Sequence, residues 1–245
     1  MTITTRTLHT TAPDGTALLS HVAMPINTPT DGKSPAILVA PEWWGLVGHP
    51  QEVAARLAYA GFVAVTMDIY GDGKMTTDAH QAGEWMTHML NNSDELMNRC
   101  QAIYQDVAAL AEVDASRLGI AGFCFGGKIA LDMARLGTPF KAVATFHGNP
   151  KPITPASADK FTAKVLVAHG AADSMISDEA IEQLRAELSH AKVDFQIDVY
   201  PNAKHGFSNP HADERARENG VDLAYDAVAA KTSWDKMVQF MKDNL

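Results

Sequence analysis

Three residues of the types used in nucleophilic catalysis lie far apart in the chain, in the order Cys124, Asp173 and His205. A thiol needs a base to take its proton, and a histidine base needs a carboxylate to hold its tautomer. Each of the three lies just past a stretch that is typical of a β-strand, and glycine is close enough to allow a tight loop. Their types and order therefore predict attack of a thiolate on a carbonyl group.

The surroundings of Cys124 predict a sharp turn from a strand into a helix. Residues 118–123 form an apolar run, as a buried strand requires, and residues 127–135 have apolar side chains at helical spacing. Gly122 and Gly126 flank the cysteine, where larger side chains would collide with the strand or the helix. This is the nucleophile-elbow arrangement, which aims its nucleophile at the N–H groups and dipole of a helix N-terminus. The alternative is that Cys124 is an ordinary buried thiol.

Length and composition predict one globular domain over residues 1–245. The chain is 46% hydrophobic and 20% charged, and its net charge of −9 argues against a nucleic-acid or anionic membrane surface. We expect no signal peptide, no membrane-spanning segment, no metal and no cofactor, and the low cysteine content predicts a cytoplasmic protein. With only two cysteines no disulfide framework is possible, and Cys100 is expected to be a core thiol on a helix.

Strands alternate with helices along the chain, which predicts a mostly parallel sheet with helices on both faces. The first two strands are expected to form a hairpin. Polar loops are expected over residues 25–35 and over a segment that ends at residue 219. Ser93 is expected to cap the third helix. The expected strands are 2–11, 16–24, 36–40, 62–67, 118–123, 140–146, 164–168 and 193–200, and the expected helices are 50–59, 81–90, 94–113, 127–135, 177–188 and 224–241.

Polar residues at the ends of the strands mark the expected site, because ligands of open parallel sheets bind at the carboxyl ends of the strands. The order nucleophile, acid, histidine is that of α/β-hydrolases. His147 and His169 also lie at strand ends and are alternatives to His205 as the base, but neither follows Asp173 in the chain. Asp68 is another residue at a strand end, where an aspartate is usually a turn residue.

Four motifs give the chain a specific resemblance over essentially its whole length. They are GFCFGG at 122–127, HGAAD at 169–173, YPNAKHGF at 200–207 and PEWWG at 41–45. Together they resemble the dienelactone hydrolase family. The resemblance implies an α/β-hydrolase fold without a large cap domain and a triad of Cys124, His205 and Asp173. It also implies a carboxylic ester hydrolase similar to carboxymethylenebutenolidase.

The same resemblance implies roles for residues of the PEWWG motif. In the family, a glutamate at the position of Glu42 contacts the nucleophilic thiol and helps to deprotonate it when substrate arrives. The backbone N–H groups of Trp43 and Phe125 would form the oxyanion hole, and removal of one such donor typically costs about 3 kcal/mol of barrier. The alternative for Glu42 is a loop carboxylate without a catalytic role.

The chain departs from the family at two positions that concern the substrate. Dienelactone hydrolases proper hold the carboxylate of the lactone with two arginines, and this chain has Asp72 and Asn209 at those places. A small neutral or apolar ester or lactone is therefore the expected substrate. No nucleic-acid or membrane partner is expected, and the protein is expected to be a monomer or a small homo-oligomer. The side chains expected to line the pocket are Trp43, Trp44, Tyr70 and Phe207.

Two other classes of protein use a comparable thiol. Glutamine amidotransferases and related cysteine peptidases also have a Gly-x-Cys-x-Gly elbow, but their histidine precedes an acid, commonly as His-x-Glu, and no such pair follows His205. A non-enzymatic redox-sensing module would keep the thiol for oxidation. The presence of both an acid and a base argues against a sensor.

Overall fold

The structure is a computed structural model that describes residues 2–26 and 32–245. The chain divides into two compact units, one formed by Met1–Ile120 with Leu245 and the other by Ala121–Asn244. The strand β5 (Val113–Phe123) begins in the first unit and ends in the second. The expectation of a single domain remains a prediction, and each unit is described by itself below.

The first unit contains a sheet with strands in the order β1-β2-β4-β3-β5. β1 and β2 form the expected antiparallel hairpin, β2 pairs with β4 in antiparallel fashion, and β3 and β4 are parallel. Its elements before β5 are β1 (Ile3–Thr11), β2 (Ala17–Pro25), β3 (Ser34–Ala40), α1 (His49–Tyr59), β4 (Val63–Thr66), α2 (Ala79–Asn91) and α3 (Ser93–Ala108).

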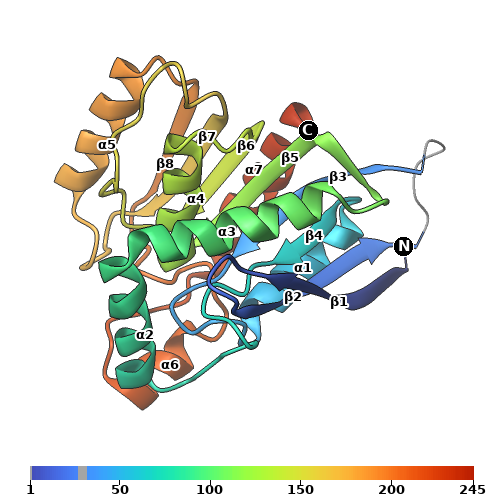
Figure 1. The fold of residues 1–245 in the computed structure, drawn as a ribbon. Helices are drawn as coiled ribbons and strands as arrows, with labels where there is room; N and C mark the ends of the chain where they lie inside the picture. Colours follow the sequence, from blue (N-terminus) through green and yellow to red (C-terminus); the bar gives the residue numbers. More distant parts are fainter. Residues whose placement is uncertain (1, 27–31) are drawn as a thin grey trace. The chain divides into compact units, whose positions relative to one another are not determined.

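Helices cover the sheet of the first unit. α1 packs on β2, β3 and β4, whereas α3 packs on β1 and β2 (Figure 1). β4 is buried throughout, as expected for a strand with both faces covered. Cys100 is fully buried on α3, and burial raises the pKa of its thiol to about 12. The core role expected for this cysteine is confirmed.

The second unit contains a parallel run of strands in the order β6-β7-β8. α4 packs on β6 and α7 packs on β6 and β7. Its elements after β5 are α4 (Phe125–Arg135), β6 (Ala142–Phe146), β7 (Lys164–Gly170), α5 (Asp178–His190), β8 (Phe195–Tyr200), α6 (Ala212–Asn219) and α7 (Ala227–Asn244).

The close packing of α4 depends on glycine. A Cβ atom added at Gly127 would lie 2.8 Å from the Cα atom of Gly148, so no larger residue fits at this crossing.

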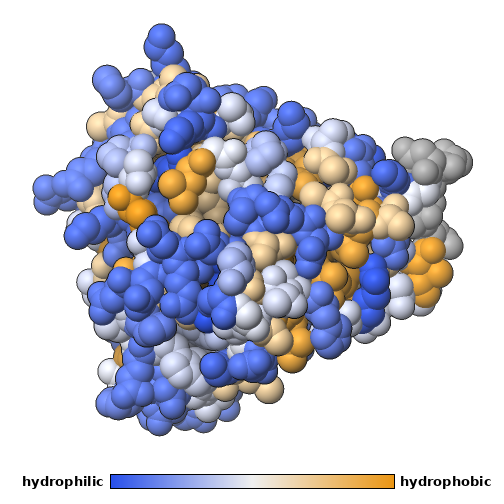
Figure 2. All heavy atoms as spheres, viewed as in Figure 1, coloured by the Kyte–Doolittle hydropathy of each residue, from blue (hydrophilic) through white to orange (hydrophobic). Residues whose placement is uncertain are grey.

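Away from the sheet, Figure 2 shows mostly hydrophilic residues over α5 and over α2. On α5 the buried residues are Ile181, Leu184 and Leu188, which repeat at the spacing of an amphipathic helix.

Two expectations about helices were wrong. α3 ends at Ala108 rather than at residue 113, and Asn92, not Ser93, is its N-cap. Val113 continues the apolar spacing of the helix but is the first residue of β5, and periodicity cannot separate these two reasons for burial.

The polar segment expected to be a loop through residue 219 contains α6. Only Ala212 of this helix is buried, so it has no apolar face to reveal it in the sequence. Gly220 follows it with φ 66°, the left-handed conformation in which many helices end. β5 begins at Val113, five residues before the expected strand 118–123, and the other expected elements are confirmed within a few residues. The expected loop over 25–35 includes residues 27–31, which lie outside the described residues.

A buried network of charges joins α4, α5 and the loop after β6. The side chain of Arg135 is fully buried, and its Nε and Nη2 donate to Oε1 and Oε2 of Glu187 at 2.9 and 2.7 Å. Its Nη1 donates to Oδ1 of Asp132 at 2.9 Å, and Nη2 also donates to the carbonyl oxygen of Pro150 at 2.8 Å. Lys128 donates to Oδ2 of Asp132 at 2.8 Å. The guanidinium therefore has an acceptor on all three elements.

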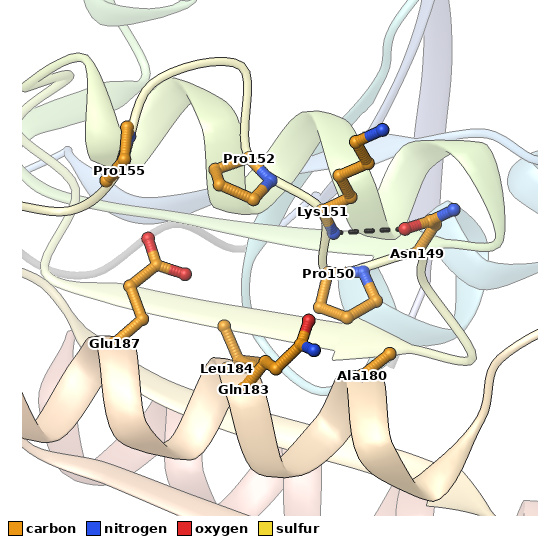
Figure 3. Close-up of a pocket in the computed structure, with 9 residues that line it drawn as sticks. All are labelled: Asn149, Pro150, Lys151, Pro152, Pro155, Ala180, Gln183, Leu184 and Glu187. Carbon is orange, nitrogen blue, oxygen red and sulfur yellow. Dashed lines mark hydrogen bonds between the residues drawn. The ribbon is translucent and has the colours of Figure 1, made fainter.

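Figure 3 shows the carboxylate of Glu187 rising from α5 toward the loop that carries Pro150, Pro152 and Pro155. Oε1 of Glu187 also accepts the backbone N–H of Ala156 at 2.7 Å. One carboxylate thus fixes both a buried cation and the backbone of a proline-rich loop.

We expect Glu187→Ala to lower the free energy of unfolding by about 3 kcal/mol, because it leaves the buried guanidinium without its bidentate partner. Urea unfolding followed by circular dichroism measures the change. Glu182→Ala on the same helix is the matched control, since its partner Arg185 is exposed at the surface, and it should cost about 0.5 kcal/mol or less. Equal effects of the two substitutions would show that the network does not stabilise the fold.

Candidate active site

Cys124 lies at a strained turn between β5 and α4. Its φ of 53° and ψ of −114° are rare for any residue other than glycine, and it occupies the N-cap position of α4. Its backbone N–H donates to the carbonyl oxygen of Phe146 at 3.0 Å. A Cβ atom at Gly122 would collide with the carbonyl oxygen of Gly126, which explains the glycine. The strand-to-helix elbow predicted around a half-buried cysteine is therefore present.

Asp173 lies in the turn after β7, and its carboxylate is fully buried. Oδ1 accepts the backbone N–H groups of Met175 at 2.8 Å and Ile176 at 3.0 Å. Oδ2 lies 2.8 Å from Nδ1 of His205. The carboxylate is held by the backbone on one side and faces the imidazole on the other.

The loops that carry Asp173 and His205 are joined by their backbones. The N–H of Ala172 donates to the carbonyl oxygen of Ala203 at 3.0 Å. A Cβ atom at Gly170 would collide with that same carbonyl oxygen, so the close approach requires glycine. Two segments about 30 residues apart in the sequence thus meet at the ends of β7 and β8.

The electrostatic surroundings of His205 favour its protonated form. Burial alone would lower the pKa of this imidazole, but the negative charge of Cys124 and the hydrogen bond to Asp173 outweigh it and raise the pKa to about 10. Nε2 is buried and has no hydrogen-bond partner of standard geometry among the described residues, and a looser hydrogen bond with Cys124 adds to the effect of its charge on the pKa of His205. Such looseness is usual for a site without substrate. Cys124, Asp173 and His205 come together within the second unit.

The two alternative histidines lie nearby but do not take the place of His205. The ring of His147 stands edge-on to that of His205 with centroids 5.0 Å apart, and its Nε2 is 2.9 Å from Oγ of Ser208. His169 is buried, with Nε2 at 3.5 Å from Oδ1 of Asp178. The imidazole that reaches the carboxylate of Asp173 is that of His205.

In the first unit, Glu42 is buried in the loop after β3, and its Oε2 lies 3.8 Å from Nδ1 of the buried His49. The sequence did not single out His49, although it stands at the start of α1, seven residues after Glu42. The carbonyl oxygen of Trp43 accepts the hydroxyl of Tyr70 at 3.0 Å, and the rings of Trp43 and Trp44 lie 4.8 Å apart. The segment that holds Glu42 is therefore a packed, ordered turn.

Asp68, the remaining polar residue at a strand end, has a structural role. Its carboxylate accepts the backbone N–H groups of Leu19, Gly71 and Gly73 at 2.7–2.9 Å, which ties the loop after β4 to β2. These contacts match the usual turn role of an aspartate in this position, whereas its place among the polar residues of the expected site stays a prediction.

The residues expected to line the substrate pocket are mostly buried. Trp44 and Tyr70 are 2% and 3% exposed, and Phe207 is fully buried against Phe146, His147 and Tyr200. Contact of these side chains with substrate remains a prediction, as do the donor roles of Trp43 and Phe125.

The two positions that depart from the family carry no positive charge. Asp72 is exposed, with its carboxylate 3.9 Å from Nζ of Lys74. Asn209 is buried, and its Oδ1 accepts the N–H of His211 at 2.9 Å.

Within residues 2–26 and 32–245, no helix is long and apolar enough to cross a membrane, and no group of three or more His, Cys, Asp or Glu side chains could hold a metal ion.

Known proteins resemble this chain over its whole length. A protein from Synechocystis sp. named "Putative carboxymethylenebutenolidase" is 29% identical over the full length of both chains. A Bradyrhizobium protein named "Probable 2-oxo-3-(5-oxofuran-2-ylidene)propanoate lactonase" is 28% identical over 95% of this chain and 92% of its own. The crystal structure of a dienelactone hydrolase-like promiscuous phosphotriesterase from metagenomic libraries matches with a TM-score of 0.91 and 33% identity, over 100% of this chain and 99% of that one.

The structural match confirms the α/β-hydrolase fold class expected from the sequence. The sequence model of the dienelactone hydrolase family matches residues 22–245, which contain every residue of the site described above. The chain therefore belongs to the dienelactone hydrolase family, a family of carboxylic ester hydrolases.

Proposed function

We propose that the protein hydrolyses small neutral esters or lactones through a thiol acyl-enzyme, with Cys124 as nucleophile, His205 as base and Asp173 as the acid that orients it. The observation that carries this proposal is the geometry of His205, which faces the Asp173 carboxylate at 2.8 Å while the charge of Cys124 helps to raise its pKa to about 10. A thiolate and an imidazolium stabilise each other in this arrangement.

In the first half of the reaction, the thiolate of Cys124 attacks the carbonyl carbon of the ester. A C–S bond forms, and the carbonyl π electrons move onto the oxygen, which becomes an oxyanion. When the tetrahedral intermediate collapses, the C–O bond to the leaving group breaks, and Nε2–H of His205 gives its proton to the departing oxygen. Asp173 keeps the ring in the tautomer and orientation that this transfer needs.

In the second half, the neutral His205 takes a proton from a water molecule. The resulting hydroxide attacks the thioester, a second oxyanion forms, and its collapse expels the thiolate of Cys124 and releases the carboxylic acid. The imidazolium and the thiolate are then restored. The roles that the resemblance assigns to Glu42 and to the N–H groups of Trp43 and Phe125 belong to this proposal and rest on the family resemblance.

The preference for a neutral substrate follows from charge. A lactone that carries a carboxylate needs a cation to offset the loss of its hydration, and Asp72 and Asn209 supply none. One of the similar structures is that of a promiscuous phosphotriesterase. Because phosphotriesters are also neutral esters, a phosphotriester is a second candidate substrate for the same thiolate.

We expect Cys124→Ala to lower kcat/KM for p-nitrophenyl acetate at least about 1,000-fold, because the covalent route is lost. Release of p-nitrophenolate measures it. Cys100→Ala is the matched control, since this core thiol should affect stability but not turnover. Hydrolysis by Cys124→Ala at the wild-type rate would show that Cys124 is not the nucleophile.

The rate of alkylation by iodoacetamide tests the thiolate–imidazolium pair independently of any substrate. His205 remains protonated up to about pH 10, so its positive charge should favour the reactive thiolate at neutral pH. In a Cys100→Ala background, His205→Gln should slow alkylation at pH 7 about tenfold or more and leave the rate at pH 10 nearly unchanged. Equal pH profiles for the two proteins would contradict the pairing.

Glu42→Gln tests the assisting role of the carboxylate. The substitution keeps the shape of the side chain and removes its charge, so kcat/KM for p-nitrophenyl acetate should fall about tenfold or more if the carboxylate moves a proton. Glu84→Gln, on the exposed surface of α2, is the matched control and should change nothing. If Glu42→Gln lowers only the unfolding midpoint, the carboxylate is a structural partner of His49.

A further inference from the structure

His147 stands at a backbone position that the structure holds from two sides. It directly follows Phe146, whose carbonyl oxygen accepts the N–H of Cys124 at 3.0 Å, and its own N–H donates to the carbonyl oxygen of Ala168 at 2.9 Å. Its φ of 39° lies in the left-handed region, which costs free energy for a residue with a side chain. Like Cys124, it is thus a strained residue at the carboxyl end of a strand.

The side chain of His147 contacts three residues of the loop that carries the proposed base. Its ring stands edge-on to the ring of His205 at 5.0 Å and edge-on to that of Phe207 at 5.4 Å. Its Nε2 lies 2.9 Å from Oγ of Ser208. The side chain is buried, with an exposed fraction of 2%.

The hydrogen bond to Asp173 does not by itself fix the orientation of the His205 ring. The hydrogen bond to Asp173 fixes Nδ1 but allows the ring to tilt about the line that joins the two side chains. A tilt would move Nε2 away from the sulfur of Cys124 and from the leaving oxygen. A second ring packed against the imidazole, and a hydrogen bond that anchors this ring to the same loop, both oppose the tilt.

We propose that His147, anchored by Ser208, is a positioning residue that holds the imidazole of His205 in line with the sulfur of Cys124. The proposal rests on the proposed function, because it concerns the same thiol and base. His147 forms no bond with substrate and transfers no proton. It fixes the orientation on which proton transfer depends, and a small misplacement of a catalytic group can cost about a hundredfold in rate.

The test uses His147→Phe, Ser208→Ala and the double variant, all in the full chain. His147→Phe keeps a ring of similar shape but cannot bond Ser208, and Ser208→Ala removes the same bond from the other side. Each should lower kcat for p-nitrophenyl acetate about tenfold and leave KM within about twofold, since alignment is lost but binding is not. The double variant should be no slower than either single variant, because both remove one interaction.

The second readout is the pH profile of Cys124 alkylation in the Cys100→Ala background. Misalignment of the imidazolium should slow alkylation at pH 7 relative to pH 10 in all three variants. Ser233→Ala is the matched control: Ser233 is buried on α7, its Oγ donates to the carbonyl oxygen of Ala230 at 3.1 Å, and its loss should leave both readouts unchanged.

Two results would overturn the proposal in distinguishable ways. If the His147 and Ser208 variants unfold earlier but keep wild-type kcat and the wild-type alkylation profile, the contact is only packing and the proposed function stands. If the wild-type protein itself shows the alkylation profile of an unassisted thiol, then the pairing of Cys124 with His205 is wrong, and the positioning role falls with it.

Discussion

The site depends on one buried contact, the 2.8 Å approach of the Asp173 carboxylate to Nδ1 of His205. Two backbone N–H groups hold the carboxylate, and the proximity of Cys124 and the hydrogen bond to Asp173 both raise the pKa of the imidazole. Burial would otherwise drive the proton off this ring. Within the second unit, the carboxylate and the sulfur therefore both raise the pKa of the ring that lies near them.

Strain and glycine make this contact possible. Cys124 and His147 both have positive φ although they carry side chains, and hydrogen bonds from neighbouring strands hold both positions. Gly122 and Gly170 allow backbones to pass where a Cβ atom would collide with a carbonyl oxygen. The fold thus uses part of the free energy gained in its buried strands to keep a few residues in unfavourable conformations at the ends of those strands.

Much of the fold could be read from the sequence because its signals are local. The apolar runs of the buried strands and the Gly-x-Cys-x-Gly turn reflect contacts within a few residues, and these elements were predicted within a few residues of their ends. The two wrong predictions, for α6 and for the end of α3, also follow from the local nature of these signals. α6 has only Ala212 buried and so carries no apolar pattern, and Val113 fits the spacing of α3 although a strand buries it. A pattern of burial shows that a side chain is inside but not which element brings it there.

The sequence by itself indicated the family, the order of strands and helices apart from α6, and Cys124 and Asp173 as the expected thiol and carboxylate, because these follow from residue types and their order. Only the tertiary structure decided which histidine meets Asp173, since His147, His169 and His205 all stand at strand ends and differ only in where their loops lead. It also revealed the contact of His147 with Ser208 and that of Glu42 with His49. Such pairings depend on loop paths, which are set by backbone contacts between distant segments and leave little trace in local sequence.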